Sequence, residues 1–471
     1  MKQNHQLEIS DLSPASNQKN NSHILVKIRN FLIKAAPDQA LWALAEASVI
    51  GTTAACASIM FTHGERTINA LHTSLAIYLP GWLAVITLVT VGSLIAGLIV
   101  QFIAPEITGS GIPQVKAVLN AVAIPLNFRV ALSKLIGSCV SLGVGLPLGK
   151  EGPTVHIGAA CGAILAKLAG ESPRRSRQLI AAGAGAGLAA AFNAPLAGVM
   201  FVIEELLRDI SRATVITAFF ACFFAAVVAR WIGNHSLDIP ANSPFPHAQF
   251  TTTDVPFCIF VGIVCGALGS YFNNGIIKSC QLNKKFFGKN IAFRITLAGC
   301  FCGIVIALLP ESFKNFTGVA QILFEQHSWK LPLVILLANF VLTIVAYGSG
   351  VPGGLFAPSL TIGAATGYLV GLLEQLLFPQ NMGCAVTLAL AGMGAFFTGV
   401  ARVPITATII VFEITTDFNM LLPLMICSIT AFMVGERIAP GSIYDRLLEM
   451  QGIHLPGTPS GSKIEFTQAD D

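Results

Sequence analysis

Three short stretches rich in glycine and proline stand where helices are predicted to begin. They are Gly109-Ser110-Gly111-Ile112-Pro113, Gly149-Lys150-Glu151-Gly152-Pro153 and Gly354-Leu355-Phe356-Ala357-Pro358. Proline fits the first turn of a helix, and a preceding glycine lets the backbone bend closely. That first turn presents unpaired N–H groups and about half a positive charge. If the three starts meet, they form a site for a small anion; the alternative is that they are ordinary helix breaks.

Partial charges suit the transport of an anion better than full charges do. A lysine or arginine in direct contact would hold the anion too tightly for release, whereas partial charges bind it and let it go. We therefore expect Lys150 to raise the local concentration of anions through its charge rather than to bind the anion directly.

The chain contains an internal repeat. Gly145–Gly162 aligns without gaps with Gly350–Gly367, at an offset of 205 residues, and half of the aligned positions are identical. A second block aligns at an offset of 209 residues, matching Gly183, Gly185, Pro195 and Glu204 with Gly392, Gly394, Pro404 and Glu413. Duplicated halves with helices interrupted at corresponding places are typical of secondary transporters, whose sites lie at the midplane between the halves.

Glu151 departs from this repeat. The equivalent residue is Phe356, so the scaffold does not require a carboxylate there, and an acid inside a membrane is by default a candidate for function. At a helix start the carboxylate can itself occupy the anion site, and once protonated it can swing away. Anion occupancy and proton uptake are then alternative states of one position, a physical basis for exchange in opposite directions. The alternative is a capping acid that only stabilises the helix.

A second acid also lies outside the repeat. Glu204 aligns with Glu413, and we interpret this matching pair as structural. Glu205 aligns with an apolar residue and is therefore the second candidate for function. The alternative is that Glu205 is a solvated acid at a helix end, beside Arg208 and Arg212.

The helices that position these residues are predicted to lie in lipid. Of the 471 residues, 54% are hydrophobic and 11% are charged, whereas a soluble chain averages about 25% charged residues. The net charge of +4 comes from few residues and gives no indication of nucleic-acid binding. The eleven cysteines lack CxxC or His/Cys ligand spacing, so we interpret them as small buried side chains. We expect no metal and no cofactor.

Apolar segments, predicted to be helices, follow one another along the chain. They cover roughly 41–62, 81–104, 128–147, 157–169, 179–203, 213–231, 255–272, 292–309, 331–346, 359–378, 385–398, 405–416 and 420–434. Several are shorter than the ~20 residues needed to cross the hydrocarbon core. Such helices are tolerated in a membrane only where their free backbone groups face protein or a watery cavity.

The predicted organisation is two membrane halves with polar ends. We expect a cytoplasmic tail at 1–36, repeat half 1 at 37–232, a connecting loop at 233–252, repeat half 2 at 253–450 and a short cytoplasmic tail at 451–471. The polar start argues against a cleaved signal peptide, whose apolar core would lie close to Met1.

Taken together, the motifs resemble those of the CLC family of chloride channels and chloride/proton exchangers. The resemblance spans nearly all of residues 40–450 and rests on GSGIP at 109–113, GKEGP at 149–153, GGLFAP at 353–358, Gly185–Gly198 and Tyr444. It implies an all-helical polytopic membrane protein with two inverted-topology repeats and interrupted, tilted helices. It also implies a homodimer with one pore per subunit, in the inner (plasma) membrane, with both termini in the cytoplasm.

The resemblance further implies chloride ligands. A central chloride would be held by the hydroxyl groups of Ser110 and Tyr444 and the backbone N–H groups of Leu355 and Phe356. An outer chloride would be lined by backbone groups of Gly149, Lys150, Gly152 and Ala357. In the family, serine at the Ser110 position goes with chloride and proline with nitrate, and the fluoride-exporting branch lacks the serine–tyrosine pair.

The two acids take proton roles in this resemblance. Glu151 would be the chloride gate and outer proton site. Family exchangers carry a glutamate at the position of Glu205 and channels usually an apolar residue, so Glu205 would be the inner proton site. Gln114 and Lys116 occupy positions that are often acidic in relatives, which leaves the charge pairing around their helix open.

The predicted function is therefore exchange of chloride for protons, with membrane lipid as surroundings and no enzymatic activity. A passive chloride channel of the same fold is the first alternative. A membrane-embedded hydrolase would need a pattern such as HExxH or two intramembrane aspartates, which the sequence lacks. A proton-coupled cation or amino-acid carrier would need carboxylates and carbonyls at helix C-termini, whereas the bent stretches here precede helix N-termini.

Overall fold

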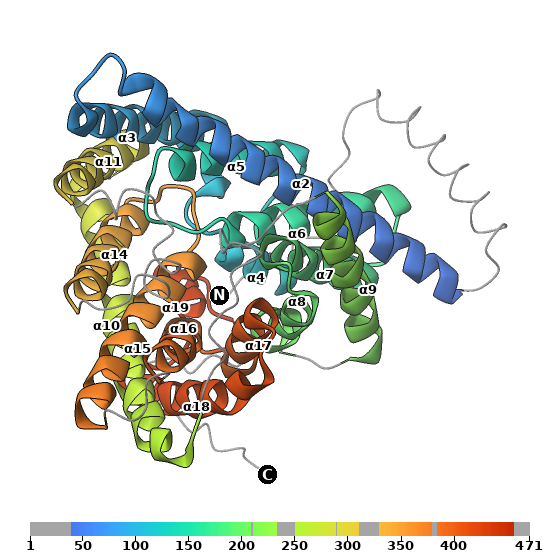
Figure 1. Cartoon of the computed structure of the whole chain (residues 1–471). Helices are drawn as coiled ribbons and strands as arrows, with labels where there is room; N and C mark the ends of the chain where they lie inside the picture. Colours follow the sequence, from blue (N-terminus) through green and yellow to red (C-terminus); the bar gives the residue numbers. More distant parts are fainter. Residues whose placement is uncertain are drawn as a thin grey trace, which may run out of the picture.

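The computed structural model describes residues 39–208, 211–232, 250–288, 290–309, 329–378 and 384–455. Regular structure within these ranges is helical apart from one isolated bridge, and Figure 1 shows the helices packed against one another. The first half contains α2 (Gln39–Leu75), α3 (Gly81–Leu98), α4 (Ile112–Leu119), α5 (Phe128–Gly143), α6 (Glu151–Ala169), α7 (Pro173–Phe192), α8 (Pro195–Phe201) and α9 (Arg212–Trp231). The second contains α10 (Val255–Phe287), α11 (Ile291–Leu308), α14 (Lys330–Gly348), α15 (Phe356–Leu377), α16 (Cys384–Ala401), α17 (Pro404–Thr415), α18 (Leu421–Ile438) and α19 (Ile443–Met450).

The predicted tail at 1–36 lies outside the described residues. So do most of the predicted loop at 233–252 and of the tail at 451–471.

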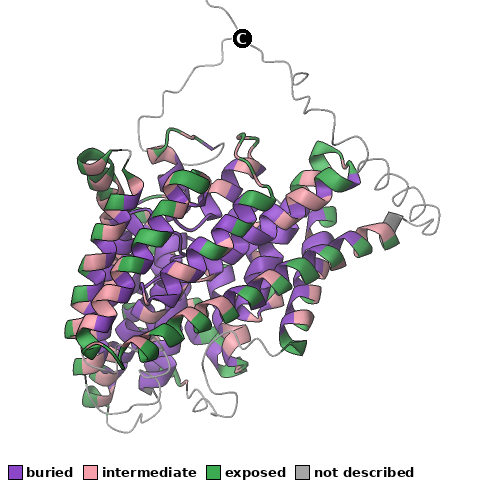
Figure 2. Cartoon of the chain, turned by 90° about the horizontal axis from the view of Figure 1, so that it is seen from above, coloured by how far each residue is buried: buried purple, intermediate pink, exposed green. Residues whose placement is uncertain are grey.

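The outer surface of the described helices is apolar. Nine of these helices are long and apolar enough to cross a membrane. Large side chains such as Phe102, Trp231 and Leu308 remain exposed. Figure 2 shows exposed residues along the outer helices around a buried interior. Because so large an apolar surface requires lipid as its solvent, the prediction of an all-helical, multi-pass membrane protein is confirmed.

The apolar segment at 179–203 contains two helices. Asn193, with a φ of 56°, ends α7, and α8 begins at Pro195. A left-handed residue stops a helix, and proline has no N–H with which to continue one. The second half has the same break, because Arg402, with a φ of 62°, and Pro404 separate α16 from α17.

The two halves meet at equivalent glycines. The N–H of Gly149 donates to the carbonyl of Gly354 at 2.8 Å, and the N–H of Gly354 donates back at 2.6 Å. These glycines are separated by the repeat offset of 205 residues. A reciprocal antiparallel pair between equivalent residues is what a two-fold relation between the halves produces, so the pseudo-two-fold axis passes beside this pair.

Two equivalent glutamates cap helices of the opposite half. Glu413 of α17 accepts two backbone N–H bonds from the start of α8, at 3.0 and 2.8 Å. Glu204, in the π-helical segment η3 (Val202–Leu207), accepts two from the start of α17, at 3.1 and 2.7 Å. Each carboxylate satisfies N–H groups that have no partner within their own helix. The structural interpretation of Glu204 and Glu413 is confirmed.

Small residues bring neighbouring helices close together. A Cβ on Gly158 of α6 would clash with the carbonyl of Gly183 of α7. In the second half, a Cβ on Gly363 of α15 would clash in the same way with Gly392 of α16. Close backbone approach of this kind supplies the packing that holds helices together in lipid. It fixes α6 and α15, the two helices that begin beside the Gly149–Gly354 pair.

Replacing either capping acid should lower stability. Glu413→Gln and Glu204→Gln keep the size of the side chain but remove the charged acceptor, at a cost of about 1–2 kcal/mol each. The readout is the temperature at which half of the detergent-solubilised protein has left the monodisperse peak. We expect that temperature to fall by several degrees in both variants. Glu171→Gln, in the partly exposed loop before α7, is the control. Equal midpoints in all three variants would contradict the capping role.

Candidate functional site

The three glycine- and proline-rich stretches lie together in the structure. A Cβ on Gly152 would be 2.9 Å from the Cβ of Ser110 and 3.1 Å from the Cα of Gly354. The first and third stretches are also joined, because the N–H of Gly353 donates to the carbonyl of Gly109 at 3.1 Å. The starts of α4, α6 and α15 therefore gather their unpaired N–H groups and partial positive charges in one place.

Buried hydroxyl groups stand beside these helix starts. Ser110 is fully buried, and its oxygen accepts a hydrogen bond from the Tyr347 hydroxyl at 3.3 Å. Tyr444 of α19 is fully buried too, and its hydroxyl has no hydrogen-bond partner within the described ranges. Sequence reasoning missed Tyr347, although this residue lies three positions before the repeated block that begins at Gly350.

Phe356 anchors the start of α15. Its ring centre lies 4.3 Å from that of Phe397, 5.8 Å from that of Phe201 and 6.0 Å from that of Phe192. These rings come from α16, α8 and α7, so both halves hold the residue in place. Phe356 thus supplies a backbone N–H to the helix start while its side chain fills the core. This explains why the position equivalent to Glu151 carries an apolar residue.

The Glu151 carboxylate lies at the start of α15, in the opposite half. Glu151 is 2% exposed. A Cβ on Gly149 would clash with one Glu151 carboxylate oxygen and would lie 3.0 Å from the backbone nitrogen of Ala357. The carboxylate therefore lies close to the first N–H groups of α15, and its Oε2 has no hydrogen-bond partner among the described residues. Because a small anion would be drawn to the same helix start, the carboxylate and such an anion compete for one position.

Lys150 points away from this position. Its ammonium lies 3.4 Å from the hydroxyl oxygen of Thr62 of α2. The side chain therefore carries a positive charge near the helix starts without placing it at the Glu151 carboxylate.

A second lysine, Lys134 of α5, holds the backbone that leads into α4. It is fully buried, and its ammonium donates to the carbonyls of Ile107 and Gly109 at 2.7 and 2.5 Å. Its side-chain nitrogen thus contacts the backbone one residue before Ser110. Sequence reasoning missed Lys134, for which the available signal was a lysine within the apolar segment 128–147.

Glu205 belongs to a buried group of charges at the other end of α4. The Lys116 ammonium lies 2.7 Å from Glu205 and 2.5 Å from Asp445, and Arg208 contacts the second oxygen of Asp445 at 2.5 Å. The Ser442 hydroxyl donates to Glu205 at 3.0 Å. Glu205 is 1% exposed, so the alternative of a solvated acid is wrong.

The open question about charge pairing along α4 is thereby answered. Gln114 donates to the carbonyl of Thr108 at 2.9 Å, whereas Lys116 pairs with Glu205 and Asp445. Asp445 follows Tyr444 directly, but no sequence pattern indicated that it would lie beside Lys116.

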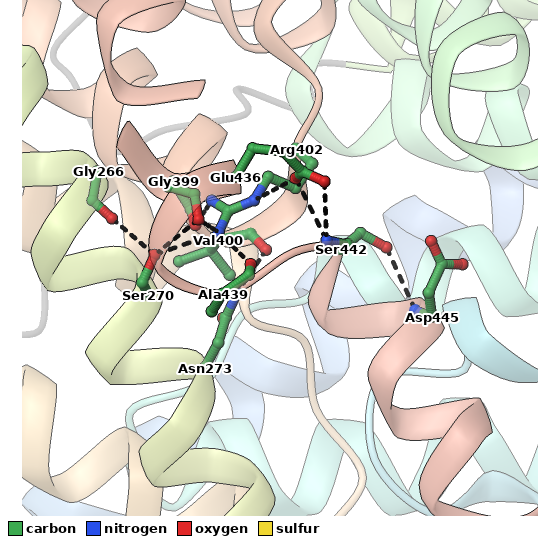
Figure 3. Close-up of polar contacts among 12 residues, drawn as sticks. Gly266, Ser270, Asn273, Gly399, Val400, Arg402, Glu436, Ala439, Ser442 and Asp445 are labelled. Carbon is green, nitrogen blue, oxygen red and sulfur yellow. Dashed lines mark hydrogen bonds and ion pairs between the residues drawn. The ribbon is translucent and has the colours of Figure 1, made fainter. Parts of the chain in front are cut away.

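Arg402 orders the turn between α18 and α19. Figure 3 shows its guanidinium among backbone carbonyls, and it donates to two at the end of α18, at 2.6 and 2.8 Å. Glu436 pairs with it at 3.3 Å. After this turn Ser442 caps α19 by accepting from the N–H of Asp445 at 3.2 Å. Arg402 thus positions the helix that carries Tyr444 and Asp445.

The chemistry available here is anion binding and proton exchange. Backbone N–H groups and hydroxyls can hold an anion through partial charges, and two buried carboxylates can take up protons. Within the described ranges, no group of three or more His, Cys, Asp or Glu side chains could hold a metal ion.

The chain resembles known transporters in sequence. Residues 92–436 match the family described as voltage gated chloride channel. The H(+)/Cl(-) exchange transporter ClcA of Vibrio cholerae is 34% identical over 394 residues, which cover 82% of this chain and 83% of that protein. ClcA of Vibrio campbellii is 31% identical over 441 residues, which cover 89% and 92%.

Solved structures show the same fold. A slow cyanobacterial Cl-/H+ antiporter has a TM-score of 0.80 at 29% identity and covers 87% of this chain and 97% of its own. A CLC-type fluoride/proton antiporter has a TM-score of 0.70 at 20% identity, covers 86% and 98%, and shows the fold alone. Since the family match and the ClcA relatives cover most of the sequence, the chain belongs to the voltage-gated chloride channel (CLC) family.

Proposed function

We propose that this chain is a secondary active transporter that exchanges chloride for protons in opposite directions across a membrane. The observation that carries the proposal is the position of the Glu151 carboxylate beside the start of α15, close to the backbone nitrogen of Ala357. Chloride and an ionised carboxylate cannot both occupy that helix start. The Vibrio cholerae relative and the cyanobacterial structure, which are both named as chloride/proton exchangers, support this proposal.

The chloride pathway in this proposal runs through the three helix starts. The outer chloride takes the place of the Glu151 carboxylate, between Ala357 and the backbone of 149–152. The central chloride is bound by the hydroxyls of Ser110 and Tyr444 and by the N–H groups that open α15. The buried Tyr444 hydroxyl, which has no hydrogen-bond partner within the described ranges, supports this assignment because a buried O–H group normally has an acceptor.

The proton pathway joins two acids. Protonation removes the charge that holds Glu151 at α15, so the side chain leaves and chloride enters. Glu205 is the inner proton site. Its support is its burial, its place outside the repeat and its link through Lys116 to Asp445, the neighbour of Tyr444. Protons and chloride then share the position at Glu151 but follow separate routes beyond it.

A passive chloride channel of the same fold is the second candidate. The ion pair of Glu205 with Lys116 favours the channel, because a carboxylate held ionised by a cation takes up protons less readily. The proton measurements below distinguish the two.

We also propose a homodimer with one pathway per subunit, in the inner membrane with both termini cytoplasmic. The family resemblance supports this arrangement. Light scattering of the detergent-solubilised protein should give the mass of two chains.

Glu151→Ala should separate chloride movement from proton movement. The substitution removes the only carboxylate that competes for the α15 start in this proposal, so chloride flux persists while proton transport falls by tenfold or more. The assay uses liposomes holding a chloride gradient and a pH electrode outside. Wild-type liposomes should show chloride-driven proton movement; chloride flux without it would favour the channel. Retained coupling in Glu151→Ala would remove Glu151 from its role.

Glu205→Gln should abolish proton movement while chloride still passes. The amide cannot take up a proton, but it keeps the size and most hydrogen bonds of the side chain. Glu204→Gln is the matched control from the adjacent residue, because it removes a helix cap and leaves Glu205 intact. Proton movement that persists in Glu205→Gln, or is lost equally in both variants, would exclude Glu205 as a specific proton site.

Ser110→Pro should shift the anion preference toward nitrate. The change removes a hydroxyl donor, which costs about 1 kcal/mol or more of chloride binding. The measurement compares initial chloride and nitrate fluxes in the same liposomes. The control is Thr62→Val, which removes a buried hydroxyl that contacts Lys150 and the carbonyl of Ser58. An unchanged flux ratio would count against Ser110 as a ligand.

A further inference from the structure

Four charged side chains form a buried cluster around Glu205. Lys116 comes from α4, Glu205 from η3, Arg208 from the residue after η3, and Asp445 from α19. Lys116, Glu205 and Asp445 are 1–2% exposed, whereas the Arg208 side chain is 40% exposed. Two cations and two carboxylates balance one another, as burial of charge requires.

One ammonium serves both carboxylates. Lys116 lies 2.7 Å from Glu205 and 2.5 Å from Asp445, so it contacts both at once. Asp445 has a second cation, Arg208, at 2.5 Å. Glu205 has no other cationic contact within 4 Å among the described residues; its second partner is the Ser442 hydroxyl at 3.0 Å. The charge of Glu205 therefore depends on Lys116 far more than that of Asp445 does.

Proton uptake at Glu205 must disturb this arrangement. A protonated carboxyl group no longer attracts the ammonium, and the cluster would carry one excess positive charge. Asp445 offers the ammonium a carboxylate already in contact, so Lys116 can stay buried while Glu205 is neutral. The other titratable groups nearby are Tyr444, the neighbour of Asp445 on α19, and Glu436 of α18, which is paired with Arg402.

We propose that Lys116 is a positioning residue for proton transfer at Glu205: its ammonium holds the carboxylate ionised between turnovers and stays paired with Asp445 alone each time Glu205 accepts a proton. The inference rests on the proposed exchange of chloride for protons. Only one proton is transferred in this step. A proton from water binds a Glu205 oxygen, Lys116 remains an ammonium throughout, and the reverse step restores the first ion pair.

Two substitutions should move proton transport in opposite directions. Lys116→Met removes the cation that opposes protonation of Glu205, so the pH of half-maximal chloride-driven proton transport should rise by about one unit or more. Asp445→Asn removes the alternative partner of the ammonium and a neighbouring negative charge. Half-maximal transport should then fall to lower pH by a similar amount. The readout is the initial rate of proton movement in liposomes at a series of symmetric pH values.

Two further variants keep the test decisive. Lys116→Arg retains the cation and should stay within a few tenths of a pH unit of wild type, as a rough expectation for an unchanged charge. The double variant Lys116→Met/Asp445→Asn removes one charge of each sign, so the cluster stays balanced, and its midpoint should lie between those of the single variants. If Lys116→Met does not fold, Asp445→Asn and the double variant still give the direction of the shift.

Opposite shifts support the proposal, because loss of packing alone would lower proton transport without moving its pH midpoint in two directions. Shifts in the same direction, or no shift, overturn it, provided that Glu205→Gln abolishes proton movement. If Glu205→Gln leaves proton movement intact, the proposed function of Glu205 itself fails, and that result is distinguishable from failure of the role of Lys116.

Discussion

Unpaired N–H groups at the starts of interrupted helices are the constraint on which the rest of the structure depends. In the interior these groups need an acceptor, and the fold supplies carboxylates from the opposite half. Glu413 serves the start of α8 and Glu204 the start of α17, as fixed caps. At the start of α15 the nearby carboxylate is that of Glu151, which an anion replaces in our proposal. The same interaction thus builds the fold and, where the carboxylate can leave, opens a path.

Two short helices connect the anion position with the buried charges around Glu205. α4 has eight residues, a length of roughly 12 Å, with Ser110 before its start and Lys116 near its end. α19 carries Tyr444 and Asp445 as neighbours. Each helix therefore contributes one hydroxyl group to the proposed chloride pathway and one charge to the cluster. Movement or rearrangement of α4 or α19 would affect both, which gives coupling a physical connection.

The sequence was informative where the physical signal is local or repeated. The repeat paired Gly149 with Gly354, and the structure joins these residues by reciprocal hydrogen bonds. Hydropathy did not reveal the break at Asn193, where a single left-handed residue divides one apolar segment into two helices. No sequence pattern indicated that Tyr347 lies beside Ser110 or that Lys116 pairs with Asp445. Such contacts join residues hundreds of positions apart, and no periodicity records them.

The central claim is that the Glu151 carboxylate and the transported anion exclude each other at the start of α15. Anomalous diffraction from crystals grown in bromide, for wild type and Glu151→Gln, tests it most directly. The predicted result is a bromide peak at the N–H of Ala357 only in Glu151→Gln, with the glutamine side chain displaced. A bromide at that N–H together with an undisplaced Glu151 carboxylate in the wild type, or no bromide there in Glu151→Gln, would contradict the claim.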